Sequence, residues 1–267
     1  MSLVYAALLG VVQGLSEFLP VSSSAHLILA RAFFGWDGEA FGLAFDVACH
    51  VGTLAAVAWY FHRDLLAMLR ATPRVLSADP DARRIWLLAV GTLPAVVVGL
   101  LFAGAIEGGL RTPGVAAWTL AIGAAGLLWV ERLPPRQRDE RGVSMAEALA
   151  IGVAQASALV PGVSRSGATI TVGMLLGLRR DAAARFSFLL GVPAILAAAA
   201  KEGLVLARTG LAADELRLFV VGMASSALIG YLTIKYVLRY LAAHQLDVFA
   251  YYRLALAAGV VIWAWLG

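Results

Sequence analysis

Long apolar segments separated by short polar connections make up most of this chain. Period-2 alternation of apolar and polar residues is absent, and several prolines and glycines fall inside the apolar segments. These features are typical of bilayer-crossing helices, some of them broken, and not of a β-barrel. A spanning helix needs about 20 mostly apolar residues. The pattern predicts six such helices, near Phe41–Phe61, Ile85–Ile106, Pro113–Val130, Phe186–Ala200, Leu218–Tyr240 and Phe249–Leu266.

Two further apolar segments are interrupted by proline. Ser2–Leu19 is followed by Pro20 and then by Ser22–Phe34, and the segment Met145–Leu178 contains Pro161. Each piece of the first segment has about 15 residues, near 22 Å at 1.5 Å per residue, which is too short for a hydrocarbon core of about 30 Å. We therefore predict two re-entrant helical hairpins. Such backbone is tolerated at membrane depth only inside protein or beside a wet cavity, so the breaks also predict a site.

The two broken segments are copies of one another. Gly10–Leu27 and Gly152–Thr169 lie 142 positions apart and share glycine, valine, glutamine and serine positions. Each half of the chain then contains one hairpin and three crossings, and an odd number of crossings inverts the second half. The predicted fold is an all-α polytopic membrane protein with an inverted-topology repeat. It forms a single membrane domain over residues 1–267, with repeat one at about 1–131, a linker at 132–144 and repeat two at about 145–267.

Composition and charge place this fold in a membrane. Hydrophobic residues make up 61% of the chain, charged residues 14%, and the mean hydropathy is +0.84, whereas a soluble domain is nearer one half and one quarter. The net charge of +4 predicts no nucleic-acid partner, because the arginines lie in short connections. The single cysteine excludes an internal disulfide, and the N-terminus lacks the pattern of a removable signal peptide.

The basic residues also predict an orientation. Fifteen of them, including Arg63 and Arg253, are assigned to loops on one side and five to the other. The positive-inside rule puts the richer side in the cytoplasm. Both termini then face outward, the first hairpin enters from outside, the second enters from the cytoplasm, and their tips can meet.

Serine clusters follow each proline. The returning helices begin at Ser22-Ser23-Ser24 and at Ser164-Arg165-Ser166. Serine caps the free N–H groups of a helix start, and such a start attracts anions. Arg165 adds a planar fork that suits phosphate. Ordinary capping explains one copy alone, but two copies with an arginine at membrane depth favour a phosphate or diphosphate site.

Other polar residues near the breaks are candidates for chemistry. Glu17 at membrane depth costs at least about 2.5 kcal/mol, so it predicts a function and a partner, which we expect to be Arg165, directly or through a divalent cation. Gln13, four residues earlier, lies on the same helix face and can orient Glu17. A structural Glu17–Arg165 ion pair that ties the repeats together is the alternative. His26 lies within one turn of Ser23 and can act as its base, or it can be an ordinary hydrogen-bonded core histidine.

Asp46 and His50 form another pair with i,i+4 spacing, on the first predicted span. Such a pair can support a site, but the spacing favours a helix-stabilising pair.

These motifs resemble the undecaprenyl-diphosphate phosphatase family of bacteria, which is linked to bacitracin resistance. The resemblance rests on Gln13 and Glu17 four apart, on PVSSSAH at Pro20–His26 and on PGVSRSGAT at Pro161–Thr169. It implies removal of the terminal phosphate from a C55 isoprenoid diphosphate, which regenerates the lipid carrier of peptidoglycan synthesis. It further implies paired re-entrant hairpins in the bacterial inner membrane and an active site open to the periplasm.

The site residues that the resemblance implies follow by position. The acidic motif falls on Gln13 and Glu17, the serine-rich stretch on Ser22, Ser23, Ser24 and His26, and the phosphate-binding motif on Ser164, Arg165, Ser166 and Thr169. Many members have glutamate where this chain has Gln13, so a Mg²⁺ or Ca²⁺ site would have Glu17 as its only carboxylate here. Ala25 replaces a frequent glycine.

Two functional hypotheses follow. In the first, an enzyme, Ser23, His26, Glu17 and Arg165 are catalytic: Ser23 attacks the terminal phosphorus with His26 or Glu17 as base, or water attacks directly. In the second, the broken helices belong to a flippase that returns the lipid monophosphate to the cytoplasmic leaflet. The expected partners are a polyprenyl diphosphate and the bilayer; a homodimer is compatible with the sequence, which does not define the oligomeric state.

Overall fold

The computed structural model of the protein describes residues 3–36, 41–134, 136–210 and 212–266. The described residues contain no β-strand, only one isolated bridge between Arg138 and Leu178. Their helices are α1 (Leu3–Ser16), α2 (Ser23–Phe34), α3 (Leu43–Tyr60), α4 (His62–Ala71), α5 (Pro80–Gly109), α6 (Pro113–Glu131), α7 (Met145–Ser157), α8 (Arg165–Leu175), α9 (Arg180–Thr209), α10 (Ala213–Leu241) and α11 (Asp247–Leu266), with short 3₁₀ turns at Thr72–Arg74 and Glu140–Gly142.

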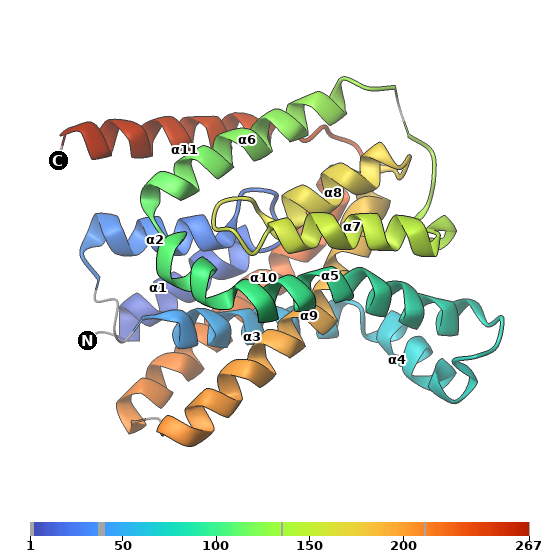
Figure 1. The fold of residues 1–267 in the computed structure, drawn as a ribbon, viewed down its shortest axis with the longest axis horizontal. Coiled ribbons are helices and arrows are strands. Elements are labelled where there is room, and N and C mark those ends of the chain that lie inside the picture. The colour runs from blue at the N-terminus through green and yellow to red at the C-terminus, as the bar shows by residue number, and fades with distance from the viewer. Residues whose placement is uncertain (1–2, 37–40, 135, 211, 267) are drawn as a thin grey trace.

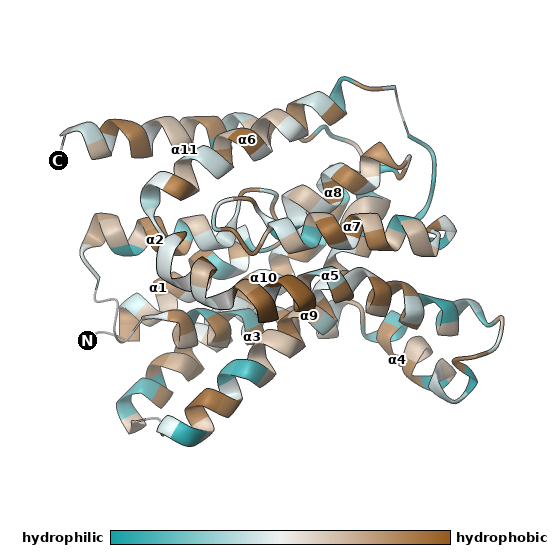
Figure 2. Ribbon diagram, in the orientation of Figure 1, coloured by the Kyte–Doolittle hydropathy of each residue, from teal (hydrophilic) through white to brown (hydrophobic). Residues whose placement is uncertain are grey.

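Six of these helices are long and apolar enough to cross a membrane: α3, α5, α6, α9, α10 and α11. This confirms the predicted all-α fold with six candidate spans. Figure 2 shows hydrophobic residues along the middle of these helices and hydrophilic residues at their ends and connections. α5 and α9 are 30 residues each and contain Pro94 and Pro193. They extend at both ends beyond the predicted spans Ile85–Ile106 and Phe186–Ala200.

The four short apolar helices form two pairs, α1 with α2 and α7 with α8. α1 ends at Ser16, ahead of Pro20, and α7 ends at Ser157, ahead of Pro161, so both predicted breaks are confirmed. We call the connection from Glu17 to Ser22 the first loop, and that from Ala158 to Ser164 the second loop. Figure 1 shows the two loops side by side near the centre of the bundle.

Glycines let each pair pack against a span of the other half of the chain. A Cβ on Gly10 of α1 would lie 2.4 Å from the carbonyl oxygen of Gly222 in α10. A Cβ on Gly152 of α7 would lie 2.3 Å from the carbonyl oxygen of Gly91 in α5. Real Cβ atoms do not approach this closely, so these helices touch backbone to backbone. The two halves of the chain are therefore interlocked.

The largest cluster of buried apolar side chains lies beneath the two loops. Phe18 of the first loop and Phe188 of α9 are fully buried and meet edge to face at 5.1 Å. The loops thus rest on a packed core.

The amphipathic helix α4 was not predicted. It is ten residues long and largely exposed, and its Asp64 joins Arg84 of α5 and Arg185 of α9 in an ion-pair cluster.

Candidate functional site

Both loops end in the same unusual backbone conformation. Ser22 has φ 74° and Ser164 has φ 72°, in the left-handed region that residues other than glycine seldom adopt. Each serine caps the helix that follows: Ser22 Oγ accepts from the N–H of Ala25 at 3.5 Å, and Ser164 Oγ accepts from that of Gly167 at 3.1 Å. Strain of this kind costs about 1–3 kcal/mol and concentrates at functional sites.

Side chains tie the two loops to each other. The N–H of Gly162 in the second loop donates to Ser24 Oγ at 3.4 Å. In the opposite direction, Ser166 donates to the carbonyl of Leu19 in the first loop at 2.9 Å. These serines are matching positions of the two motifs. Each therefore holds the loop that it does not belong to.

Arg253 fixes both loops from α11. The predicted place of this arginine in a loop is wrong: it lies two turns into α11 and is 0% exposed. Its guanidinium donates only to main-chain carbonyls among the described residues, those of Pro20 in the first loop, Gly162 and Val163 in the second, and Thr119 and Leu120 in α6. Five charge-assisted bonds compensate its burial, so the loops and α6 form one unit.

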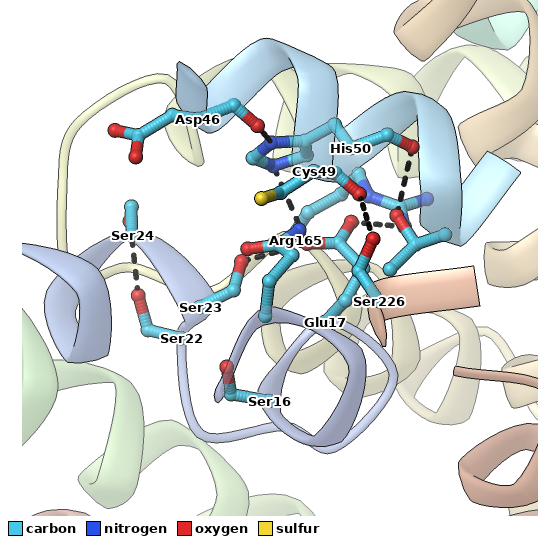
Figure 3. Close-up of polar contacts among 12 residues, drawn as sticks. Ser16, Glu17, Ser22, Ser23, Ser24, Asp46, Cys49, His50, Arg165 and Ser226 are labelled. Atoms are coloured by element: carbon cyan, nitrogen blue, oxygen red, sulfur yellow. Dashed lines mark hydrogen bonds and ion pairs between the residues drawn. The ribbon is translucent and has the colours of Figure 1, made fainter. Parts of the chain in front are cut away.

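Glu17 is the meeting point of the two loops (Figure 3). Arg165 donates to its Oε1 at 2.8 Å, and Ser23 donates to its Oε2 at 2.6 Å. Gln13 also donates to Oε2, at 2.9 Å. The carboxylate is 5% exposed. The predicted contact between Glu17 and Arg165 is thus present, and Ser23 shares the same carboxyl group.

Arg165 is positioned by α9. Its second guanidinium nitrogen donates to the carbonyl of Ser187 at 3.1 Å. A Cβ on Gly191 would lie 1.9 Å from the guanidinium of Arg165, so the absence of a side chain at Gly191 leaves the space that the guanidinium occupies. Thr169, predicted to bind phosphate, is 1% exposed and bonds Ser187 Oγ at 2.6 Å. Thr169 therefore supports the wall that holds Arg165.

His50 belongs to this site, although the sequence analysis favoured a helix pair with Asp46. Its Nε2 lies 3.4 Å from Glu17 Oε2, and its Nδ1 bonds the main-chain carbonyl of Asp46 at 2.7 Å. Figure 3 shows the Asp46 carboxylate pointing away from Glu17. That carboxylate binds Arg31 through two bonds of 2.7 and 2.9 Å and also binds Arg111. The arginines turn Asp46 outward and leave the imidazole facing Glu17.

His26 does not contact Ser23 in this arrangement. Its Nδ1 bonds the carbonyl of Ser22 at 2.7 Å, and its Nε2 bonds the hydroxyl of Tyr252 at 2.7 Å. Since Nδ1 meets a carbonyl, it carries the proton, and Nε2 accepts from Tyr252. The base within reach of the Ser23 hydroxyl is therefore Glu17, whereas the imidazole of His26 links the first loop to α11.

The residues present suit a divalent cation in one binding mode only. No three His, Cys, Asp or Glu side chains of the described residues lie close enough together to hold a metal ion. Glu17 supplies one carboxylate, and Gln13 Oε1 is buried without a partner. Mg²⁺ commonly binds through one or two carboxylates, with water and substrate phosphates completing its coordination. The pair fits that mode and not an all-protein cage.

The arrangement can transfer a phosphoryl group. A serine hydroxyl hydrogen-bonded to a carboxylate is a nucleophile with its base in place. A half-buried arginine and two capped helix starts can neutralise and align a phosphate, which is most of what phosphoryl transfer requires. The fold and the site define a multi-pass helical membrane protein with a buried centre made of serine, carboxylate and arginine.

The chain matches known proteins over nearly its whole length. The model of the family "Bacitracin resistance protein BacA" matches residues 6–259. The chain is 48% identical to an undecaprenyl-diphosphatase of Rubrobacter xylanophilus, over 97% of both chains, and 46% identical to undecaprenyl-diphosphatase 2 of Stutzerimonas stutzeri, over 98% of both. It is 42% identical to an undecaprenyl-diphosphatase of Moorella thermoacetica, over 100% of this chain and 99% of the relative. The chain belongs to the bacitracin resistance protein BacA family.

Proposed function

We propose that this protein hydrolyses undecaprenyl diphosphate to undecaprenyl phosphate and inorganic phosphate, which returns the lipid carrier to peptidoglycan synthesis and confers bacitracin resistance. Family membership and the activity named for its relatives support this reaction. One observation on this chain carries the proposal: the Ser23 hydroxyl and the Arg165 guanidinium bind the two oxygens of a single buried carboxylate, Glu17.

The proposal includes an inverted repeat. Repeat one contains α1, α2, α3, α5 and α6, and repeat two contains α7, α8, α9, α10 and α11. The matched loop conformations support it, as do the matched glycine contacts of α1 with α10 and of α7 with α5. The basic connections set the orientation: the pairs α1–α2 and α7–α8 enter the inner membrane from the periplasm and the cytoplasm respectively, and the site opens to the periplasm.

The chemical step follows from the geometry around Glu17. Ser23 Oγ attacks the terminal phosphorus and passes its proton to Glu17. The bond from that phosphorus to the bridging oxygen breaks, and the lipid monophosphate leaves with the electron pair. Water then cleaves the phosphoserine, which releases inorganic phosphate and restores the serine. Direct attack by water that gives its proton to Glu17 is the competing route. Arg165, Ser22, Ser24, Ser164 and Ser166 hold the diphosphate.

A divalent cation has a limited place in this proposal. Glu17 and the free Oε1 of Gln13 would hold an ion that arrives with the diphosphate. When bound, it supplies positive charge to the phosphate oxygens. Arg165 neutralises charge in the same place. We therefore expect a chelator to slow phosphate release without abolishing it.

Phosphate release from a polyprenyl diphosphate by the purified full chain in detergent tests the function. We expect release by the wild type, loss of more than 99% of the rate in Ser23→Ala and Glu17→Ala, and near-normal release by Ser16→Ala. Ser16 is a matched control because it lies beside the first loop but donates back to the carbonyl of Val12. A phosphorylated peptide spanning Ser23 distinguishes the covalent route from direct attack by water.

Two results would count against the proposal. Full turnover by Ser23→Ala removes the covalent route. No release by folded wild-type protein removes the enzyme itself and favours transport of the lipid carrier, because detergent abolishes any difference between leaflets.

A further inference from the structure

An apolar groove lies between α5 and α9, with α3 as its floor. Its volume is about 290 Å³. We call it the α5–α9 groove; the lining residues used below are Val47, Gly99, Leu100, Leu159, Ala194 and Ala198. Leu100 is 74% exposed, so the groove is open along its side toward the lipid-facing surface. Three charged residues, Arg111, Lys201 and Glu202, also line it, and they stand toward the ends of α5 and α9 that the proposed orientation places outside.

Two matching helix contacts differ beside the groove. In α1 a second glycine follows Gly10, and a Cβ on this Gly14 would lie 2.9 Å from the nitrogen of Gly230 in α10. In α7 the matching residue is Ala156 and not a glycine. A Cβ on Gly230 would meet side-chain carbons at 3.1 and 3.2 Å, whereas one on Gly99 would meet only Leu159, at 3.8 Å. The contact between α1 and α10 is therefore tightly packed at this level, whereas the contact between α7 and α5 leaves open space.

Two walls of the groove belong to helices that also form the candidate site. On α9, the residues Gly191, Ala194 and Ala198 follow one another at spacings of three and four and share a helix face, and Gly191 is where the Arg165 guanidinium lies. On α3, Val47 is three residues from His50. Both walls therefore lead from the buried carboxylate to the outer end of the helices.

Leu159 marks the difference between the loops. It stands at the position of the second motif that Glu17 holds in the first. One loop thus brings a carboxylate to the centre, and the other brings an apolar side chain to the groove beside it.

We infer that the α5–α9 groove holds the first isoprene units of the lipid diphosphate while its head group lies between Glu17 and Arg165. The inference rests on the proposed function. An apolar chain attached to a diphosphate needs an apolar path from the arginine to the bilayer. On α9 the groove begins at Ala194, three residues from the glycine against which Arg165 lies, and it runs through the outer half of the molecule. Since lipid tails are as apolar as the groove, this contact aligns the substrate more than it strengthens its binding.

A second apolar cavity, of about 620 Å³, lies between α1, α10 and α11. Leu15, Tyr236 and Tyr240 are among its lining residues. Tyr236 and Tyr240 stand near the end of α10 that the orientation places in the cytoplasm. This cavity is the competing position for the chain, in the leaflet opposite to the proposed opening of the site.

Filling the groove tests the inference. Ala198→Phe narrows it on α9, and Gly99→Leu narrows it on α5. The matched control is Leu196→Phe, which adds the same ring to α9 on its lipid-facing side, where Leu196 is 54% exposed. Phosphate release is measured with C55, C15 and C5 prenyl diphosphates. We expect both groove variants to lower kcat/KM at least tenfold for C55 and C15 and less than twofold for C5, with the control near wild type for all three.

The outcomes separate the inference from the proposed function. An equal loss for all chain lengths means damage to the site, and no loss for any means an unused groove; either overturns the inference while the enzyme stands. No release from any diphosphate by wild type removes the proposed function instead.

A photoreactive substrate gives a second, direct measurement. A C15 diphosphate with a diazirine in its second isoprene unit should label the α9 peptide that contains Ala194 and Ala198. Labelling of α10 near Tyr236 would place the chain in the competing cavity. If excess phosphatidylglycerol suppresses α9 labelling as well as unlabelled C15 diphosphate does, the groove holds ordinary acyl chains and the inference fails.

Discussion

The two loops share one backbone and differ in the side chains that they present. Ser22 and Ser164 have nearly the same positive φ, and each caps the helix that follows it. The next residue is Ser23 in the first loop and Arg165 in the second. Both side chains end on one carboxylate, that of Glu17. Two loops of the same backbone conformation thus carry a nucleophile and a cation at the same position, and the two groups approach one carboxylate from two directions.

The loops also differ in how firmly their leading helices are anchored. α7 begins with a capping box, in which Ser144 and Glu147 bond each other's main-chain N–H groups. Arg138 adds two bonds to Glu147, of 2.7 and 3.1 Å. α1 has no acidic residue in its first turn. The helix that leads into the second loop is therefore held at its start by side chains, and the helix that leads into the first loop is held mainly by packing on α10.

Replacing Arg165 should have the largest effect, because it removes what the second loop contributes. We expect Arg165→Ala to lower kcat/KM about 1000-fold, roughly 4 kcal/mol of transition-state stabilisation. Arg165→Lys should recover only part of this, because one ammonium cannot span Ser187 and Glu17 as the fork does. Phosphate release at matched thermal stability measures both. Equal activity of Lys and Arg at this position would contradict the role of the fork.

Arg253 is the anchor that the loops share, so its loss should affect them together. Arg253→Ala leaves five carbonyls without their donor, and we expect the stability to fall by about 3 kcal/mol or more. The midpoint of thermal unfolding in detergent measures this. Arg132→Ala is the matched control, since that arginine is 56% exposed and pairs with Asp247 at the start of the same helix. A midpoint for Arg253→Ala within 2 °C of the wild type would show that the loops do not depend on this residue.

The helix caps allow a direct comparison of the two loops, because a serine caps the following helix in both. Ser164→Ala and Ser22→Ala should each lower the stability by about 1 kcal/mol. The loss should be larger for Ser164, whose cap bond is 3.1 Å against 3.5 Å for Ser22. Denaturant or thermal unfolding of the two variants side by side provides the measurement. A larger loss for Ser22→Ala would reverse the order that the geometry gives.

The loops and their meeting were predictable from sequence, and the reasons are local. Proline ends a helix wherever it stands in a helix interior, and serine at the next helix start is a capping signal. Two copies of that pattern led to the prediction that Glu17 and Arg165 meet, and the two side chains are in contact. The boundaries of α5 and α9 were less predictable, because both helices continue past their apolar stretches into polar residues such as Arg83, Arg180 and Arg208.

The roles of His50, His26 and Arg253 depend on residues far away in sequence. The spacing of Asp46 and His50 describes a helix pair equally well, and only the two arginines that hold the Asp46 carboxylate turn the imidazole toward Glu17. His26 meets Tyr252, 226 positions later. Arg253 stands near the start of a span and resembles a loop arginine until the carbonyls around it are known. The sequence does contain a signal for a buried role, because Arg253 lies inside the apolar span Phe249–Leu266.

The anchoring of α7 gives the smallest expected effect and the only one that varies with pH. The bonds from Arg138 and then from Ser144 lower the pKa of Glu147 to about 2. A carboxyl group whose pKa is lowered by folding adds stability above its unfolded pKa of about 4.3, and that stability is lost as the pH falls from there toward 2. Because Glu147 lies near the surface, we expect Arg138→Ala to lower the free energy of unfolding by less than about 1 kcal/mol at pH 7.

The difference in stability between this variant and the wild type should shrink as the pH is lowered from 5 toward 3. Protonation of Glu147 then removes the same interaction from both proteins. Thermal unfolding of the two proteins across this range measures it, with Arg217→Ala, whose ion pair with Asp214 is exposed, as the control. A difference that stays constant over the range would mean that Arg138 acts through the carbonyls of Gly142 and Leu176 and not through Glu147.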